Sequence, residues 1–214
     1  MEKERIKLVS EPVQMDDGEA AEHDPLVGKV IAGHLEILSI LGAGGMSTVY
    51  KAQHLLLDRL VAVKLVQAGQ FKAKATMRFQ QEAKAATKLN HPNIATVREF
   101  GVDEEGSAYL VMDFVEGMPL SDAIKKASSL DAARTRKLMI QICEGLKHAH
   151  EAGVVHRDLK PANIILSPGE GGQETAKLVD FGIAKIVDEE SQANLTQTGE
   201  VFGTPNYMSP EQCL

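Results

Sequence analysis

HRDLKPAN, at residues 156–163, is followed by DFG at residues 180–182, and these two stretches are the most informative part of the chain. They contain two carboxylates, Asp158 and Asp180, and the side-chain amide of Asn163, in a region whose pattern indicates loop, strand, turn, strand and loop. Carboxylate and amide oxygens are the ligands that Mg²⁺ prefers, and a carboxylate can also accept the proton of a hydroxyl group. The spacing therefore predicts a cluster that binds a divalent cation and activates a hydroxyl.

A glycine-rich turn upstream adds phosphate-binding character. The segment GAGGMS, residues 42–47, connects a predicted strand at 35–41 to another at 48–52. Glycine lets backbone amides approach phosphate oxygens, because no Cβ stands in the way. A dinucleotide-binding fold would need a helix directly after such a turn, and the following Thr-Val-Tyr favours a strand instead. The turn therefore indicates a hairpin over phosphates rather than a dinucleotide site.

Lys64 lies in a third predicted strand, at 60–66, and its neighbours are apolar. Side chains alternate between the two faces of a strand, so Lys64 is predicted to share a face with Ala62. Its charged end needs an anion, for which Glu82 on the following helix and a phosphate are the two candidates. Each of these signals is common on its own, but together with the cluster at 158–180, where Lys160 adds positive charge, they indicate phosphoryl transfer.

The composition excludes several classes of protein. A net charge of −7 without a dense Lys/Arg stretch argues against nucleic-acid binding. Two cysteines are too few for a disulfide framework, and Cys143 is predicted to lie in the core. No run of about 18 apolar residues predicts a membrane span, and no secretory signal is visible. We therefore expect a cytoplasmic protein, with a membrane anchor after Leu214 left open.

Hydrophobic periodicity divides the chain into a leader and two lobes. The acidic, aperiodic stretch at 1–28 predicts a disordered leader. Residues 29–115 are predicted to form a small antiparallel β lobe with one helix, and 116–214 an incomplete helical lobe, with a cleft between the lobes as the favoured ligand site. Besides the strands already named, the β lobe should contain a helix at 76–89 and strands at 95–102 and 108–115.

The helical lobe is predicted from period-3.6 patterns. Ser121 is expected to cap a short helix, and residues 131–152 to form a longer one that ends at Gly153. Short strands are expected at 164–166 and 177–179, whereas residues 183–208 show no period. The buried stripe of the long helix is predicted to contain Leu138, Ile142, Leu146 and Ala149.

The histidines receive structural roles at this point. His156 follows two valines and is expected to pack and to hydrogen-bond within its loop. A zinc site would need convergent ligands, and the sequence shows none. The remaining histidines expected to have no special role are His54, His91, His148 and His150.

Taken together, these motifs resemble those of the eukaryotic-type (Hanks-type) protein kinases, in particular the bacterial serine/threonine branch. The resemblance covers residues 35–214 and includes the glycine loop, the strand lysine, HRDLKPAN and DFG in the family's order. It implies an α+β, bilobal fold, ATP and Mg²⁺ as cofactors, and proteins bearing Ser or Thr as substrates. Lys160-Pro161 and Gly203-Thr204-Pro205 match the serine/threonine pattern rather than the tyrosine one.

The resemblance also assigns roles to individual residues. Asp158 would orient the substrate hydroxyl and accept its proton, Lys160 would neutralise the γ-phosphoryl group, and Lys64, paired with Glu82, would contact the α- and β-phosphates. Asn163 and Asp180 would bind Mg²⁺. The residues implied to contact the nucleotide are Leu41, Gly42, Ala43, Gly44, Gly45, Met46, Ser47, Val49, Ala62, Lys64, Met112, Asp113, Val115 and Ile165.

Two further implications concern activation and the end of the chain. Arg157 beside the catalytic Asp implies activation by phosphorylation, with Thr196 and Thr198 as the expected sites, and a kinase–kinase dimer would serve autophosphorylation. Met208-Ser209-Pro210-Glu211 matches the motif that closes the activation segment, after which the family continues with further helices. A truncated, inactive nucleotide-binding or scaffold module therefore stays open as an alternative, as does a small-molecule kinase.

Overall fold

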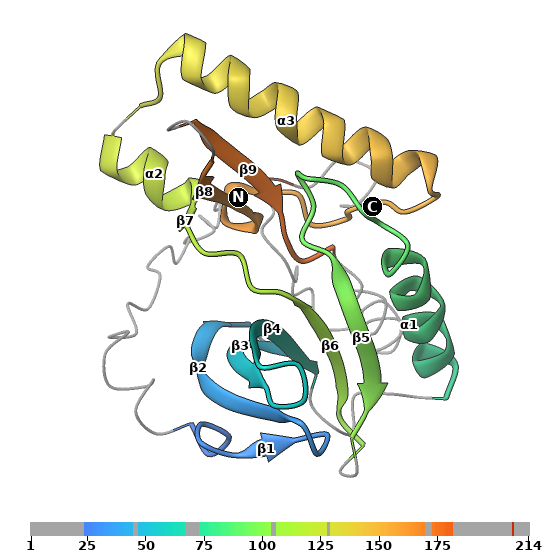
Figure 1. Ribbon diagram of the computed structural model, residues 1–214. Helices are drawn as coiled ribbons and strands as arrows, with labels where there is room; N and C mark the ends of the chain where they lie inside the picture. Colours follow the sequence, from blue (N-terminus) through green and yellow to red (C-terminus); the bar gives the residue numbers. More distant parts are fainter. Residues whose placement is uncertain are drawn as a thin grey trace, which may run out of the picture.

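The computed structural model describes residues 24–44, 47–66, 73–103, 106–127, 129–169, 173–181 and 207. A six-stranded antiparallel sheet lies at one end of the molecule, and a long helix, α3, lies at the other (Figure 1). The strand order of this sheet is β1-β2-β3-β4-β6-β5, and a second sheet of order β7-β8-β9 lies next to α3. The elements of the first lobe are β1 (Val30–Ile31), β2 (Leu35–Ala43), β3 (Ser47–His54), β4 (Arg59–Val66), α1 (Ala73–Ala86), β5 (Val97–Val102) and β6 (Ala108–Asp113).

The central strand β4 separates two hydrophobic clusters, because its side chains alternate between the faces of the sheet. Val61, Val63 and Leu65 pack inside the curl of the sheet with residues of β2, β3 and β6. Ala62 belongs to a second cluster, which continues through α1 into the other lobe. Lys64 alternates with these valines and therefore lies on the Ala62 face, as the sequence predicted.

Helix α1 lies beside β5 (Figure 1) and is the only helix of the first lobe among the described residues. It covers Ala73–Ala86, slightly earlier than the predicted 76–89. Phe79, Ala83 and Ala86 are buried, whereas the residues between them are mostly exposed. This pattern turns one apolar stripe toward the sheet and leaves the polar face in solvent.

The second lobe is built on α2 (Leu120–Ala127), α3 (Ala132–Glu151), a 3₁₀ turn η2 (Pro161–Asn163), and the strands β7 (Met118–Pro119), β8 (Ile164–Pro168) and β9 (Glu174–Leu178). Asp131 caps α3, because its carboxylate accepts hydrogen bonds from the amides of Ala133 and Arg134. Gly153 follows the helix with φ 75°, a left-handed conformation that glycine adopts without strain. Both ends of the helix therefore agree with the prediction.

Three predictions need correction. Residues 24–28 belong to the predicted leader, yet they form a turn in which Asp24 accepts a hydrogen bond from the Tyr50 hydroxyl at 3.0 Å. Ser121 lies inside α2 rather than at its N-cap, because the helix begins at Leu120. Cys143 is exposed, since the buried stripe of α3 passes through Ile142 instead. Residues 1–23 and 183–206, for which a leader and an aperiodic segment were predicted, lie outside the described residues.

Backbone pairing joins the two lobes through the segment before β5. The Ala95 amide donates to the Leu178 carbonyl at 2.9 Å, and the Leu178 amide donates to the Asn93 carbonyl at 2.8 Å. The buried Asn93 side chain also donates to the Ala176 carbonyl at 2.8 Å and to the Gln141 side chain at 3.0 Å. One amide thus ties the interlobe segment to β9 and α3.

We expect Asn93→Ala to destabilise the fold by about 1–3 kcal/mol, because the Ala176 carbonyl and the Gln141 side chain would lose their donor in a buried place. The free energy of unfolding from urea titration measures this loss. Asn90→Ala, at an exposed position three residues away, is the matched control and should change stability by less than about 0.5 kcal/mol. Equal effects of the two substitutions would contradict the role assigned to Asn93.

Candidate active site

The β8–β9 hairpin brings the HRDLKPAN and DFG stretches together. Its two strands pair from Ile164 opposite Leu178 to Pro168 opposite Glu174. The residues just outside the hairpin therefore meet, and the Val179 amide donates to the Asn163 carbonyl at 3.0 Å. A separation of 17 positions along the sequence becomes direct contact in space.

Asp158 is held by its neighbours in a defined orientation. Its carboxylate accepts a hydrogen bond from the Asn163 side-chain amide at 3.0 Å and lies 3.0 Å from the Lys160 ammonium. The same Asn163 amide donates to the Asp158 carbonyl at 2.9 Å. The Asp158 side chain is 14% exposed, so the carboxylate is fixed but reachable. These contacts suit a group that orients a hydroxyl.

Lys64 and Asp180 form an ion pair between the lobes. The ammonium of Lys64 lies 2.6 and 2.8 Å from the two carboxylate oxygens of Asp180. The side chains are only 10% and 21% exposed. Charges so far removed from water need a partner, and here each carries the other's.

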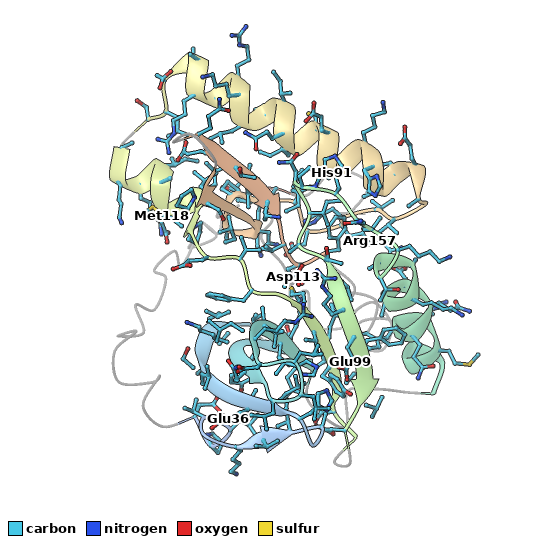
Figure 2. The ribbon with its side chains drawn as sticks, viewed as in Figure 1. Glu36, His91, Glu99, Asp113, Met118 and Arg157 are labelled. Carbon is cyan, nitrogen blue, oxygen red and sulfur yellow. The ribbon has the colours of Figure 1, made fainter. Side chains whose placement is uncertain are left out.

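The expected pairing of Lys64 with Glu82 is not what the structure shows. Glu82 instead lies 2.6 Å from the guanidinium of Arg157, the residue directly before the catalytic Asp158. Figure 2 shows Arg157 between the lobes, close to α1, which carries Glu82. The prediction was wrong on this contact because Glu82 has two cations within the reach of α1, and the position of the helix selects between them.

His156 packs behind the loop, as predicted. It is 2% exposed, its Nε2 lies 3.2 Å from the Val179 carbonyl, and its ring lies 4.6 Å from the ring of Phe181. Burial lowers the pKa of His156, and this effect outweighs the nearby carboxylates that act in the opposite direction. A neutral ring that donates to a carbonyl supports the DFG segment and is not placed as a general base.

The residues predicted to surround the adenine lie on the face of the sheet that carries Lys64. Val49 is opposite Lys64 in the β3–β4 ladder, and Ala62 is opposite Met112 in the β4–β6 ladder. Ala62 and Met112 are buried, whereas Leu41 is 48% exposed at the rim. Ile165 lies in β8 of the other lobe.

Asp113 ends β6 and begins the connection between the lobes, where Figure 2 labels it. Its carboxylate forms a two-pronged pair with Arg98, at 2.8 and 2.7 Å, and its amide donates to the Thr96 carbonyl at 3.0 Å. Since this amide is occupied, a base in the cleft would have to use the Asp113 carbonyl or the Val115 backbone.

The glycine turn is only partly described. Gly42 and Ala43 end β2, and the Gly44 amide donates to the Ser47 carbonyl at 2.9 Å, which closes a hairpin as predicted. Gly45 and Met46 lie outside the described residues, as do Thr196 and Thr198.

The donor set near Asp180 fits a hard divalent cation. The amide nitrogen of Asn163 is used by Asp158, which leaves the amide oxygen as the group that can face a metal. Carboxylate and amide oxygens, completed by water and phosphate, are the usual surroundings of Mg²⁺. Asn163 and Asp180 therefore fit the ion that the sequence implied.

A family model described as the protein kinase domain matches residues 35–213, which is most of the chain. The chain belongs to the protein kinase family. The match contains every motif from which the resemblance was drawn, and the bilobal fold, with a curled antiparallel sheet and one helix in the first lobe, agrees with it. Among the residues that the structure describes, no helix is long and apolar enough to cross a membrane.

Bacterial serine/threonine-protein kinases are the similar curated proteins. The chain is 42% identical to pkn3 of Myxococcus xanthus over 191 residues, which covers 88% of this chain and 35% of that protein. It is 41% identical to PknA of Mycobacterium tuberculosis, covering 89% and 44%, and 38% identical to PrkC of Bacillus subtilis, covering 87% and 28%. The chain thus spans less than half the length of these relatives.

Solved kinase structures share the fold. The kinase domain of PknI from Mycobacterium tuberculosis superposes with a TM-score of 0.61 at 30% identity, covering 73% of this chain and 62% of that one. Rad53 in complex with AMP-PNP gives 0.65 at 27% identity, covering 85% and 43%.

Proposed function

We propose that this chain carries the ATP-binding and catalytic residues of a serine/threonine protein kinase, which transfers the γ-phosphate of ATP to a protein hydroxyl. The observation that supports it most directly is the convergence of Asp158, Asn163, Asp180 and Lys64 where the two lobes meet. Phosphoryl transfer needs little covalent participation from the protein, so catalysis rests on positioning and on charge stabilisation. A pre-oriented carboxylate beside two ammonium groups and two oxygen ligands meets that requirement.

Each residue then has one task. Asp158, oriented by Asn163 and Lys160, accepts the proton of the attacking hydroxyl, and Lys160 offsets charge on the transferred group. Asn163 and Asp180 would hold Mg²⁺, which neutralises charge on the phosphates when bound. Lys64 remains beside Asp180 and reaches the α- and β-phosphates.

The rest of the cleft would hold the nucleotide. The glycine turn would cover the phosphates with its amides, and the backbone of the interlobe connection would pair with the base. The residues proposed for this binding are Leu41, Gly42, Ala43, Gly44, Gly45, Met46, Ser47, Val49, Ala62, Met112, Asp113, Val115 and Ile165.

We expect Asp158→Asn to reduce transfer at least ~100-fold, because an amide cannot accept the hydroxyl proton, while ATP affinity changes little. Calorimetric titration with ATP and Mg²⁺, together with incorporation of labelled γ-phosphate, measures both quantities. Asp58→Asn, at an exposed turn position, is the control and should alter neither.

Two results would overturn the proposal. ATP binding by the unaltered protein without any transfer would favour the nucleotide-binding scaffold. Phosphorylation of an aminoglycoside or of choline, but of no protein, would favour a small-molecule kinase.

Glu82 takes part in catalysis in this proposal only if it exchanges Arg157 for Lys64. In protein whose phosphates have been removed, Glu82→Gln should slow the first transfer about tenfold or more, since a charge-assisted contact contributes roughly 1.5–3 kcal/mol. Arg157→Ala should not slow this first transfer, because it releases Glu82 from its present partner. Equal losses for both variants would instead identify the Glu82–Arg157 pair as the working arrangement.

Thr196 and Thr198 are the proposed sites of autophosphorylation between two copies of the chain. Mass spectrometry after incubation with ATP should find phosphate on at least one of them, and the double change to Ala should abolish that signal. The initial rate should rise with the square of protein concentration, as expected for transfer between molecules. Absence of phosphate from both threonines would reject the assignment, and a first-order rate would reject the dimer.

A further inference from the structure

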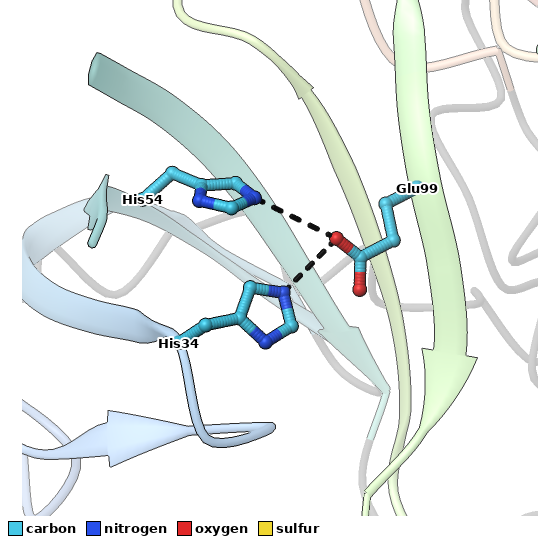
Figure 3. Close-up of side chains that lie close together, drawn as sticks. All are labelled: His34, His54 and Glu99. Carbon is cyan, nitrogen blue, oxygen red and sulfur yellow. Dashed lines mark hydrogen bonds and ion pairs between the residues drawn. The ribbon is translucent and has the colours of Figure 1, made fainter. Parts of the chain in front are cut away.

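Three side chains that the sequence gave no metal-binding role converge at one end of the six-stranded sheet. They are His34 in the turn between β1 and β2, His54 at the end of β3, and Glu99 on β5 (Figure 3). The Nε2 atoms of the histidines lie 3.0 and 3.8 Å from the same carboxylate oxygen of Glu99. One ligand atom from each residue lies within 4.8 Å of the others.

These spacings suit a tetrahedral zinc ion. Bonds of about 2.0–2.2 Å to nitrogen and oxygen place neighbouring ligands about 3.3 Å apart. The distances of 3.0 and 3.8 Å lie on either side of that value. Small rotations of the side chains would therefore bring all three donors to bonding distance.

The hydrogen bonding of His34 fixes which ring nitrogen can bind a cation. Its Nδ1 lies 2.6 Å from the Ala32 carbonyl, and a carbonyl oxygen only accepts, so Nδ1 carries the hydrogen. Nε2 then faces the Glu99 carboxylate, an arrangement that requires a proton or a cation between the two atoms. A histidine whose outer nitrogen donates to a backbone carbonyl is the usual supporting arrangement in metal sites.

Glu99 and His54 are also oriented by what surrounds them. The Tyr109 hydroxyl donates to the other carboxylate oxygen of Glu99 at 2.9 Å, which leaves the first oxygen facing the histidines. Burial, together with this bond, raises the pKa of Tyr109 to about 12, so the hydroxyl remains a donor. The Nδ1 of His54 is buried and has no hydrogen-bond partner, so the polar contact of this ring is through Nε2 toward Glu99.

We propose that His34, His54 and Glu99 form a zinc site that is separate from the catalytic cluster. Two imidazoles and one carboxylate suit zinc, whereas Mg²⁺ would need oxygen ligands throughout. Glu99 is opposite Val111 in the β5–β6 ladder, and Val111 packs inside the curl of the sheet, on the face that Lys64 does not share. His34 and Glu99 are 18% and 31% exposed at their side chains, so an ion can enter.

The position of the site gives the ion a structural task. In the strand order, β5 is one edge of the sheet, and the turn that carries His34 belongs to β1 and β2 at the other. Zinc would therefore cross-link the two ends of the curled sheet. An ion that binds only the folded protein stabilises it in proportion to its affinity.

Titration of the purified protein with Zn²⁺ alone, with Mg²⁺ in excess to occupy the Asp180 region, tests this proposal. We expect one equivalent to bind and to raise the melting temperature. His34→Ala should weaken binding at least ~100-fold, and Tyr109→Phe, which keeps the ring and removes the donor to Glu99, about tenfold. Co²⁺ in place of zinc should give a visible absorption band that His34→Ala abolishes.

His150→Ala is the matched control, because His150 is exposed on α3 beside Cys143, where surface zinc could bind. It should leave the affinity unchanged, and circular dichroism without zinc should show that every variant folds. Affinity that depends on His150 rather than on His34 would overturn the proposal, as would affinity that Tyr109→Phe leaves unaltered. The proposal would also be overturned if the unaltered protein bound no zinc equivalent.

Discussion

The ion pair between Lys64 and Asp180 is the constraint on which the arrangement of the two lobes depends. Both charges are largely removed from water, so neither is tolerable without the other. Lys64 comes from the middle of β4, and Asp180 follows β9 in the other lobe. The pair therefore requires that β9 lie close to the Lys64 face of the first sheet, which the hydrogen bonds of β9 to Asn93 and Ala95 enforce.

Local periodicity predicted the parts of the fold that depend on neighbouring residues. The alternation along β4 and the ends of α3 follow from residues within a few positions of each other, and both were read correctly from the sequence. The identity of the catalytic and metal-binding residues rested on motifs, and the structure brings Asp158, Asn163 and Asp180 together as those motifs implied. Cys143 was misplaced because one position on a helix turns a side chain by about 100°.

Contacts between distant elements were beyond the reach of sequence patterns. The partner of Glu82 depends on where α1 lies relative to the loop that carries Arg157, and no local signal records that position. His34 and Glu99 are 65 positions apart and meet only because the sheet curls. A histidine at a strand end has no period that would reveal it as a ligand, so the sequence argued against zinc where the structure brings the donors together.

The charges of the catalytic cluster are balanced pairwise, and this balance has a consequence for nucleotide binding. Lys64 neutralises Asp180, Arg157 neutralises Glu82, and Lys160 lies against Asp158. A magnesium–nucleotide complex is still anionic, so its arrival must loosen at least one of these pairs to provide a counter-charge. Arg157 and Asp180 both have left-handed backbones, with φ 60° and 55°, a conformation that costs non-glycine residues of order 1–3 kcal/mol. The pairs beside these two residues are therefore where we expect the rearrangement to begin, because a change of partner there can also relieve backbone strain.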